Sequence, residues 1–134
     1  MKNEISKLLK LTFLIHFFVA VIFGLLFTVL FELYVDVVDW PYPADPVTGR
    51  ILGAVFLGLA GGSLLAWRET RWESVKIVVQ IEIVWLIIGT AVLFFAVFTF
   101  EGLISLFIIW LQIVILIFFL VAFLYFYYDQ EWGK

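Results

Sequence analysis

The chain has 134 residues, of which 66% are hydrophobic, 20% aromatic and only 14% charged, and its formal net charge is −3. Soluble domains average about 45–50% apolar and about 25% charged residues, so this composition excludes a water-soluble domain, and its many bulky residues exclude intrinsic disorder. The sequence has no cysteine and one histidine, which excludes a disulfide framework and a multi-histidine metal or haem site.

Four apolar segments are long enough to cross the roughly 30 Å of bilayer hydrocarbon, which takes about 20 helical residues. They cover residues 11–33, 50–67, 76–100 and 103–128. The first follows a basic start, as in a signal peptide, but it is too long for one and no A-x-A cleavage pattern follows. We therefore predict an all-α fold, an integral membrane four-helix bundle that forms one domain.

The first span leads into an acidic segment. Glu32, Asp36 and Asp39 are four and three residues apart, so a helix running through them would align three carboxylates in an outer acidic ridge. Hard cations bind such oxygen clusters, but the spacing lacks the loop geometry of a calcium site. We expect the ridge to be solvated, with no metal, and we expect Asp45 to pair with Arg50 near the start of the second span.

Small residues recur every four positions along the second span. Because four residues advance a helix by about 40° beyond one turn, they form one gently winding face. Inside lipid, close backbone approach and polar contacts drive helix association, so we expect a neighbouring helix to pack on this face. The second span would then be central in the bundle, and a dimer seam or a slot for a flat ligand is the alternative. The stripe consists of Ala54, Gly58, Gly62 and Ala66.

Beyond Lys76 at its boundary, the third span contains one ionisable residue, Glu82, which lies six positions further and thus about 9 Å inside. His16 lies at a comparable depth in the first span. The two side chains can meet if these spans touch, and would then form an ion pair or share a proton. Gln80 and Ser63 fall in the same half of the membrane and can complete a polar cluster.

Three roles for Glu82 remain open. It can join helices as a protonated or hydrogen-bonded group, it can serve a ligand or a proton relay, or it can reach the interface or a partner subunit. A relay would use Glu82, His16, Gln80 and, in the outer half, Gln112. No acidic chain crosses the bilayer, which argues against a pump or channel made by one copy.

The fourth span follows the third after only Glu101 and Gly102, so we predict that these two helices are antiparallel neighbours. The first and fourth spans have few small residues and are the candidates for lipid-facing or partner-facing helices. Lysines and arginines gather near the N-terminus and between the second and third spans, and an even number of spans brings the C-terminus to the same side. We therefore expect both termini in the cytoplasm of a multi-pass cell-membrane protein.

The segment PVTGRILGAVFLGLAGGSLLAWRE, followed by a polar link and VVQIEIVW, resembles small four-helix membrane proteins of the DoxX-like kind. Such proteins show an arginine and a glycine entering a small-residue helix that ends in arginine and an acid. The resemblance implies four spans and, for some members, a place as an ancillary subunit of a quinone-linked oxidoreductase. This chain lacks a cysteine pair that would carry out redox chemistry.

No G-x-S-x-G, H-E-x-x-H or phosphate-binding glycine loop occurs in the sequence, so we expect no familiar catalysis and no cofactor. The leading hypothesis is a non-catalytic accessory subunit of a membrane complex or a homo-oligomer, with lipid and other membrane subunits as partners and no nucleic acid. The alternative is a small transporter or a protein that binds a lipophilic ligand, a quinone or a lipid, through the Glu82 and His16 cluster.

Overall fold

The structure is a computed structural model, and it describes residues 4–133. This part of the chain contains five α-helices and no strand, which confirms the predicted all-α class. All the helices except α2 are long and apolar enough to cross a membrane, as predicted. The helices are α1 (Lys7–Val29), α2 (Phe31–Val38), α3 (Pro46–Arg68), α4 (Trp72–Val97) and α5 (Leu103–Trp132).

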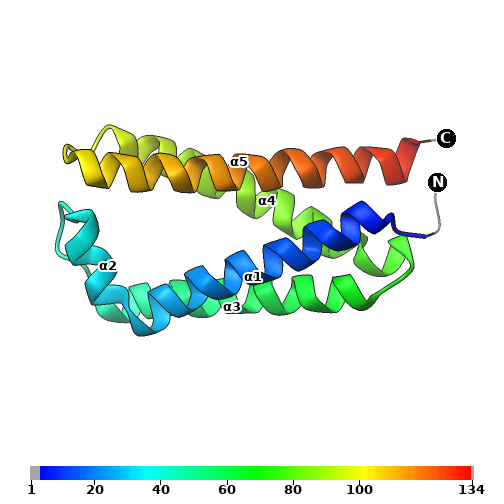
Figure 1. Cartoon of the computed structure of the whole chain (residues 1–134), viewed down its shortest axis with the longest axis horizontal. Helices are drawn as coiled ribbons and strands as arrows, with labels where there is room; N and C mark the ends of the chain where they lie inside the picture. The colour runs from blue at the N-terminus through cyan, green and yellow to red at the C-terminus, as the bar shows by residue number, and fades with distance from the viewer. Residues whose placement is uncertain (1–3, 134) are drawn as a thin grey trace.

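The four long helices form two antiparallel pairs. α1 packs along α3, α4 packs along α5, and the two pairs meet less extensively (Figure 1). The predicted pairing of the third and fourth spans is therefore confirmed. The prediction that the second span is central is wrong, because α3 packs mainly on α1 and touches α4 only lightly.

Glycines allow the close approach of α1 and α3. A Cβ atom added to Gly53 would lie 2.6 Å from the backbone nitrogen of Thr28 and 2.9 Å from the carbonyl oxygen of Gly24. A Cβ atom added to Gly24 would lie 2.6 Å from the Leu57 side chain. A side chain can change its rotamer to avoid a clash, but backbone atoms cannot, so the distance between α1 and α3 depends on glycine at position 53.

The first span is broken near its end. α1 stops at Val29, and Leu30, with φ −114° and ψ 25°, separates it from α2. Just before the break, the Thr28 hydroxyl donates a hydrogen bond to the Gly24 carbonyl at 2.7 Å, a contact that tends to bend helices. The predicted span through residue 33 is therefore two helices, and α2 turns toward α5 (Figure 1).

α2 packs its apolar face against α5 at this end of the molecule. Tyr34 and Val38 are buried. The Ser105 hydroxyl donates to the Val38 carbonyl at 2.5 Å, and Gln112 Nε2 donates to the Tyr34 hydroxyl at 3.0 Å. These two hydrogen bonds join the first helix pair to the second through α2.

The starts of α1 and α4 and the end of α5 lie together at the opposite end (Figure 1). The Ile5 amide donates to the Thr70 carbonyl at 3.0 Å. Lys76 Nζ and Trp72 Nε1 both contact Glu131 Oε1 at 2.6 Å. The cation-rich segments of the sequence therefore share one end, which we call the basic end.

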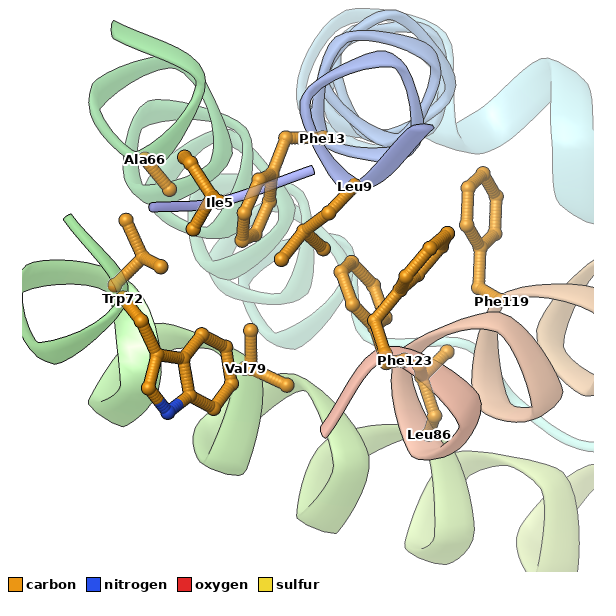
Figure 2. Close-up of a cluster of buried hydrophobic side chains, with 11 residues drawn as sticks. Ile5, Leu9, Phe13, Ala66, Trp72, Val79, Leu86, Phe119 and Phe123 are labelled. Carbon is orange, nitrogen blue, oxygen red and sulfur yellow. The ribbon is translucent and has the colours of Figure 1, made fainter. Parts of the chain in front are cut away.

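Near the basic end, all four long helices contribute to an apolar core (Figure 2). Leu9 and Phe13 of α1 point toward Phe123 of α5, and Trp72 and Val79 of α4 lie beside them. The Phe13 and Phe123 rings are 5.5 Å apart. This core lies next to a small group of buried polar side chains.

Candidate functional site

Three polar side chains from three helices meet inside the bundle. His16 Nδ1 lies 2.8 Å from Ser63 Oγ, and Ser63 Oγ can donate to Glu82 Oε1 at 3.5 Å. His16 Nε2 lies 3.5 Å from Glu82 Oε2. All three residues are buried: His16 is 5% exposed, Ser63 0% and Glu82 1%. We call this group the polar triangle.

The polar triangle joins the two helix pairs. α1 and α3 supply His16 and Ser63, and α4 supplies Glu82 across the bundle. Small buried residues, Ala60 and Ala66, lie one turn before and after Ser63 on the inner face of α3. They leave room for the long side chains of α1 and α4 to meet, although these two helices do not pack along each other.

Aromatic rings of α5 close the remaining side of the polar triangle. The His16 ring stands edge-on to Phe119, with centroids 4.8 Å apart, and to Phe123, with centroids 5.6 Å apart. Edge-to-face packing is a favoured aromatic geometry and limits the rotation of the imidazole. The polar atoms of the triangle are therefore enclosed by apolar neighbours, where an unpaired charge is costly.

The structure places the predicted relay residues in three separate groups. His16 and Glu82 are in contact, with Ser63 between them. Gln80, in contrast, donates to the Tyr127 hydroxyl at 3.1 Å. The expectation that Gln80 completes the cluster is wrong, because two residues turn a helix by about 200° and point Gln80 away from Glu82. Gln112 is bound to α2 near the opposite end.

Half of the predicted small-residue stripe is not used within the chain. Ala66 is buried, and a Cβ atom added to Gly62 would lie 3.9 Å from Val78. Ala54 is exposed, however, and a Cβ atom at Gly58 would meet nothing within 4 Å. The predicted register is therefore wrong for these two residues, because α1 packs on a different face of α3, at Gly53.

The predicted acidic ridge does not form. Glu32 pairs with Arg50 at 2.6 Å, and Asp39 lies beyond the end of α2 with a left-handed backbone, so only Asp36 remains beside Glu32 on the helix. The predicted pair of Asp45 and Arg50 is also wrong, because Asp45 caps the start of α3. Within residues 4–133, no three histidine or carboxylate side chains gather to hold a metal ion.

Two apolar grooves lie along α5 where it faces α1. One, of about 620 Å³, lies between α1 and α5 and includes Thr12 and Tyr125 in its lining. The other, of about 300 Å³, also involves α2 and is lined in part by Tyr34 and Gln112. Sequence reasoning missed both, because they arise from the arrangement of whole helices. No member of the polar triangle lines either groove.

No protein-family model, curated protein or solved structure matches the chain. The resemblance to DoxX-like proteins therefore stays a prediction.

Proposed function

We propose that the chain is a non-catalytic multi-pass protein of the cell membrane, and that it acts as an accessory subunit or a homo-oligomer by binding other transmembrane helices. Four helices of suitable length and hydropathy support the membrane location. Five cationic residues near the basic end support cytoplasmic termini, because such residues are retained on that side. They are Lys7, Lys10, Arg68, Arg71 and Lys76.

The observation that carries this proposal is an exposed notch on α3. Ala54, Gly58 and Gly61 are all exposed, and their spacing of four and three residues keeps them on one face. A Cβ atom added to Gly58 or Gly61 would meet nothing within 4 Å. Ile51 and Leu65, exposed at 60% and 65%, lie before and after these residues on the same face. We call Ala54, Gly58 and Gly61 the α3 notch.

The α3 notch favours a helix as its neighbour over lipid alone. Burial of apolar surface drives little association in a bilayer, whereas small residues let two backbones approach and form many van der Waals contacts. α1 already covers the other small-residue face of α3, at Gly53. The α3 notch is therefore a second packing face, available to a partner subunit or to a second copy.

The proposal is tested by filling the α3 notch. We expect the wild-type protein in mild detergent to run as an oligomer or with a copurifying membrane protein, measured by size-exclusion chromatography with light scattering. Gly58→Leu should release a monomer with unchanged helix content. Ala91→Leu, at an exposed small residue of α4, is the matched control and should behave as wild type. A wild-type protein that is strictly monomeric, without a partner, contradicts the proposal.

The larger groove supports a second candidate function, the binding of a lipophilic ligand such as a quinone or a lipid. Its volume of about 620 Å³ lies within the range of about 300–1,000 Å³ that is usual for ligand sites. Ala122→Trp would fill it, and should remove a lipid or quinone that native mass spectrometry finds on the wild-type protein. Retention of that ligand by the variant rejects this candidate.

A further inference from the structure

The hydrogen-bonding capacity of the polar triangle specifies how many protons it holds. A neutral imidazole has one N–H and one lone pair, a serine hydroxyl donates once, and a carboxylate only accepts. If His16 Nδ1–H donates to Ser63 and Ser63 donates to Glu82 Oε1, two contacts are made. The third contact then brings the Nε2 lone pair against Glu82 Oε2, two acceptors 3.5 Å apart.

We propose that His16, Ser63 and Glu82 form a binding site for one proton, shared between Glu82 Oε2 and His16 Nε2. With the proton on Oε2, a neutral carboxylic acid donates to a neutral imidazole. With the proton on Nε2, an imidazolium donates to a carboxylate. Both forms give a polar triangle of zero net charge in which each of the three contacts contains one hydrogen.

The same count holds when the hydrogen bonds run in the opposite direction. Glu82 Oε1–H then donates to Ser63, Ser63 donates to His16 Nδ1, and His16 Nε2–H donates to Glu82 Oε2. This arrangement also needs one proton beyond the neutral imidazole and the ionised carboxylate. The proton number therefore follows from the heavy-atom geometry and does not depend on the imidazole tautomer.

Burial opposes any other proton number. Without the proton, the polar triangle has a charge of −1, although Glu82 is only 1% exposed and its Oε2 has no hydrogen-bond donor among the described residues. With a second proton its charge is +1. In both cases an uncompensated charge is enclosed in the bundle, which is strongly unfavourable.

Among the described residues, no ion pair or hydrogen bond joins a further titratable side chain to the polar triangle. α3 contributes Ser63, and α5 contributes the rings of Phe119 and Phe123. Lys76, the lysine of α4, is paired with Glu131 at the basic end. The charge balance of the polar triangle is therefore set by His16 and Glu82 alone.

The arrangement holds a proton and does not pass it across the bundle. The three contacts form a closed ring, and aromatic side chains cover the side toward α5. Gln80 and Gln112, the residues that would extend a relay, are bound to Tyr127 and Tyr34. The shared proton thus joins α4 to the α1 and α3 pair, independently of any partner at the α3 notch.

The composition of the chain allows a direct test. His16 is the only histidine, so ¹⁵N-histidine labelling gives the NMR signals of one imidazole, provided that the purification tag contains no histidine. Infrared spectroscopy reports whether a carboxyl group is protonated. We expect the two measurements together to find one proton shared by the pair between about pH 5 and pH 8. An ionised Glu82 beside a neutral imidazole would overturn the proposal, as would a protonated Glu82 beside an imidazolium.

Matched variants assign the signal. Glu82→Gln keeps the size of the side chain and should abolish the protonated-carboxyl band or, for an ion pair, convert imidazolium to neutral imidazole. Glu101→Gln, at an exposed glutamate, should change neither signal. If Glu82→Gln does not fold, Ser63→Ala should still show one proton on the pair, and a proton number of zero or two in that variant overturns the proposal.

A flux measurement tests whether the proton is held. The wild-type protein is reconstituted in vesicles of phosphatidylcholine and phosphatidylglycerol that contain a pH-sensitive dye. We expect proton leakage equal to that of protein-free vesicles. Leakage that rises with wild-type protein and disappears with Glu82→Gln would overturn the inference that the polar triangle is closed.

Discussion

Ser63 takes part in both hydrogen bonds that connect α3 to the other polar side chains of the interior. It is fully buried, 2.8 Å from the imidazole of His16 and 3.5 Å from the carboxyl of Glu82. A hydroxyl is small enough to lie between two larger groups, and it can both donate and accept. Removing the Ser63 hydroxyl therefore measures what its hydrogen bonds contribute to stability, with little change in side-chain volume.

We expect Ser63→Ala to lower the free energy of unfolding by about 0.6–1.7 kcal/mol, the usual range for hydrogen bonds between membrane helices. Titration with sodium dodecyl sulfate in mixed micelles, followed by tryptophan fluorescence, measures this change. Ser74→Ala, at an exposed serine of α4, is the control and should stay within about 0.5 kcal/mol of wild type. Equal stability of the two variants would show that the hydrogen bonds of Ser63 contribute nothing.

Gly53 and Gly58 offer a second comparison within one helix. Gly53→Ala places a Cβ atom against the backbone of α1, so we expect a loss of about 1–3 kcal/mol, as for other overpacked sites. Gly58→Ala places its Cβ atom in open space and should leave the stability of the monomer unchanged or higher. The same unfolding titration compares them. A Gly53→Ala protein as stable as Gly58→Ala would contradict the close contact of α1 and α3.

At the residue scale, the sequence predicted the contact of His16 and Glu82 correctly, because that contact depends on the depth of each residue along its helix. His16 and Glu82 lie at equal distances from the nearest lysines, and the structure brings them together. Sequence reasoning failed where rotation about a helix axis decided. α3 has small residues on several faces, and the sequence does not say which face α1 occupies. Gly53, which α1 contacts, and Gly58, which was predicted to be contacted, differ by a rotation of about 140° about the helix axis.

At the scale of one element, α3 begins with a well-formed cap. The Asp45 carboxylate accepts hydrogen bonds from the Val47 and Thr48 amides at 3.1 and 3.2 Å and from the Thr48 hydroxyl at 2.6 Å. These bonds satisfy amides that have no partner within the helix, and Pro46 fits the first helical position, where no amide is needed. The capping residue is thus separate from the ion pair of Glu32 and Arg50.

The cap gives the first turn of α3 a defined pH dependence. The hydrogen bond from the Thr48 side chain, together with those from the two amides, lowers the pKa of Asp45 below its ordinary value of 3.8. The stabilisation is therefore complete above about pH 4 and is lost as the pH falls through the lower pKa of the folded state. We expect Asp45→Ala to increase amide exchange at Val47 and Thr48 at pH 7, measured by hydrogen–deuterium exchange. Unchanged exchange would contradict the cap.

Helix boundaries show what an apolar pattern leaves open. At the basic end, α1, α4 and α5 all extend past the apolar segments, because Lys7, Trp72 and Glu131 continue the helices into polar surroundings. The break at Leu30 contains neither proline nor glycine, and its local signal is the weaker one of the Thr28 hydroxyl bonded to the Gly24 carbonyl. Beyond the break, hydrogen bonds at Tyr34 and Val38 hold α2 against α5.

At the scale of the whole molecule, the absence of cysteine makes orientation measurable. We expect Tyr42→Cys, in the segment between α2 and α3, to react with a membrane-impermeant thiol reagent in intact cells. Glu69→Cys, between α3 and α4, should react only after the membrane is opened, because it lies at the basic end. Both positions are exposed, so burial does not explain a difference. The reverse labelling pattern would show that the termini face outward.

The division into two helix pairs has a consequence for biosynthesis. The close contact between α1 and α3 uses residues that leave the ribosome before α4 and α5 are made. This hairpin can therefore assemble in the bilayer first, with His16 and Ser63 already adjacent. If α4 crosses a bilayer, Glu82 would be inserted after the hydrogen-bonding groups of His16 and Ser63 are in place. This order of synthesis would lower the cost of inserting the acidic residue of α4.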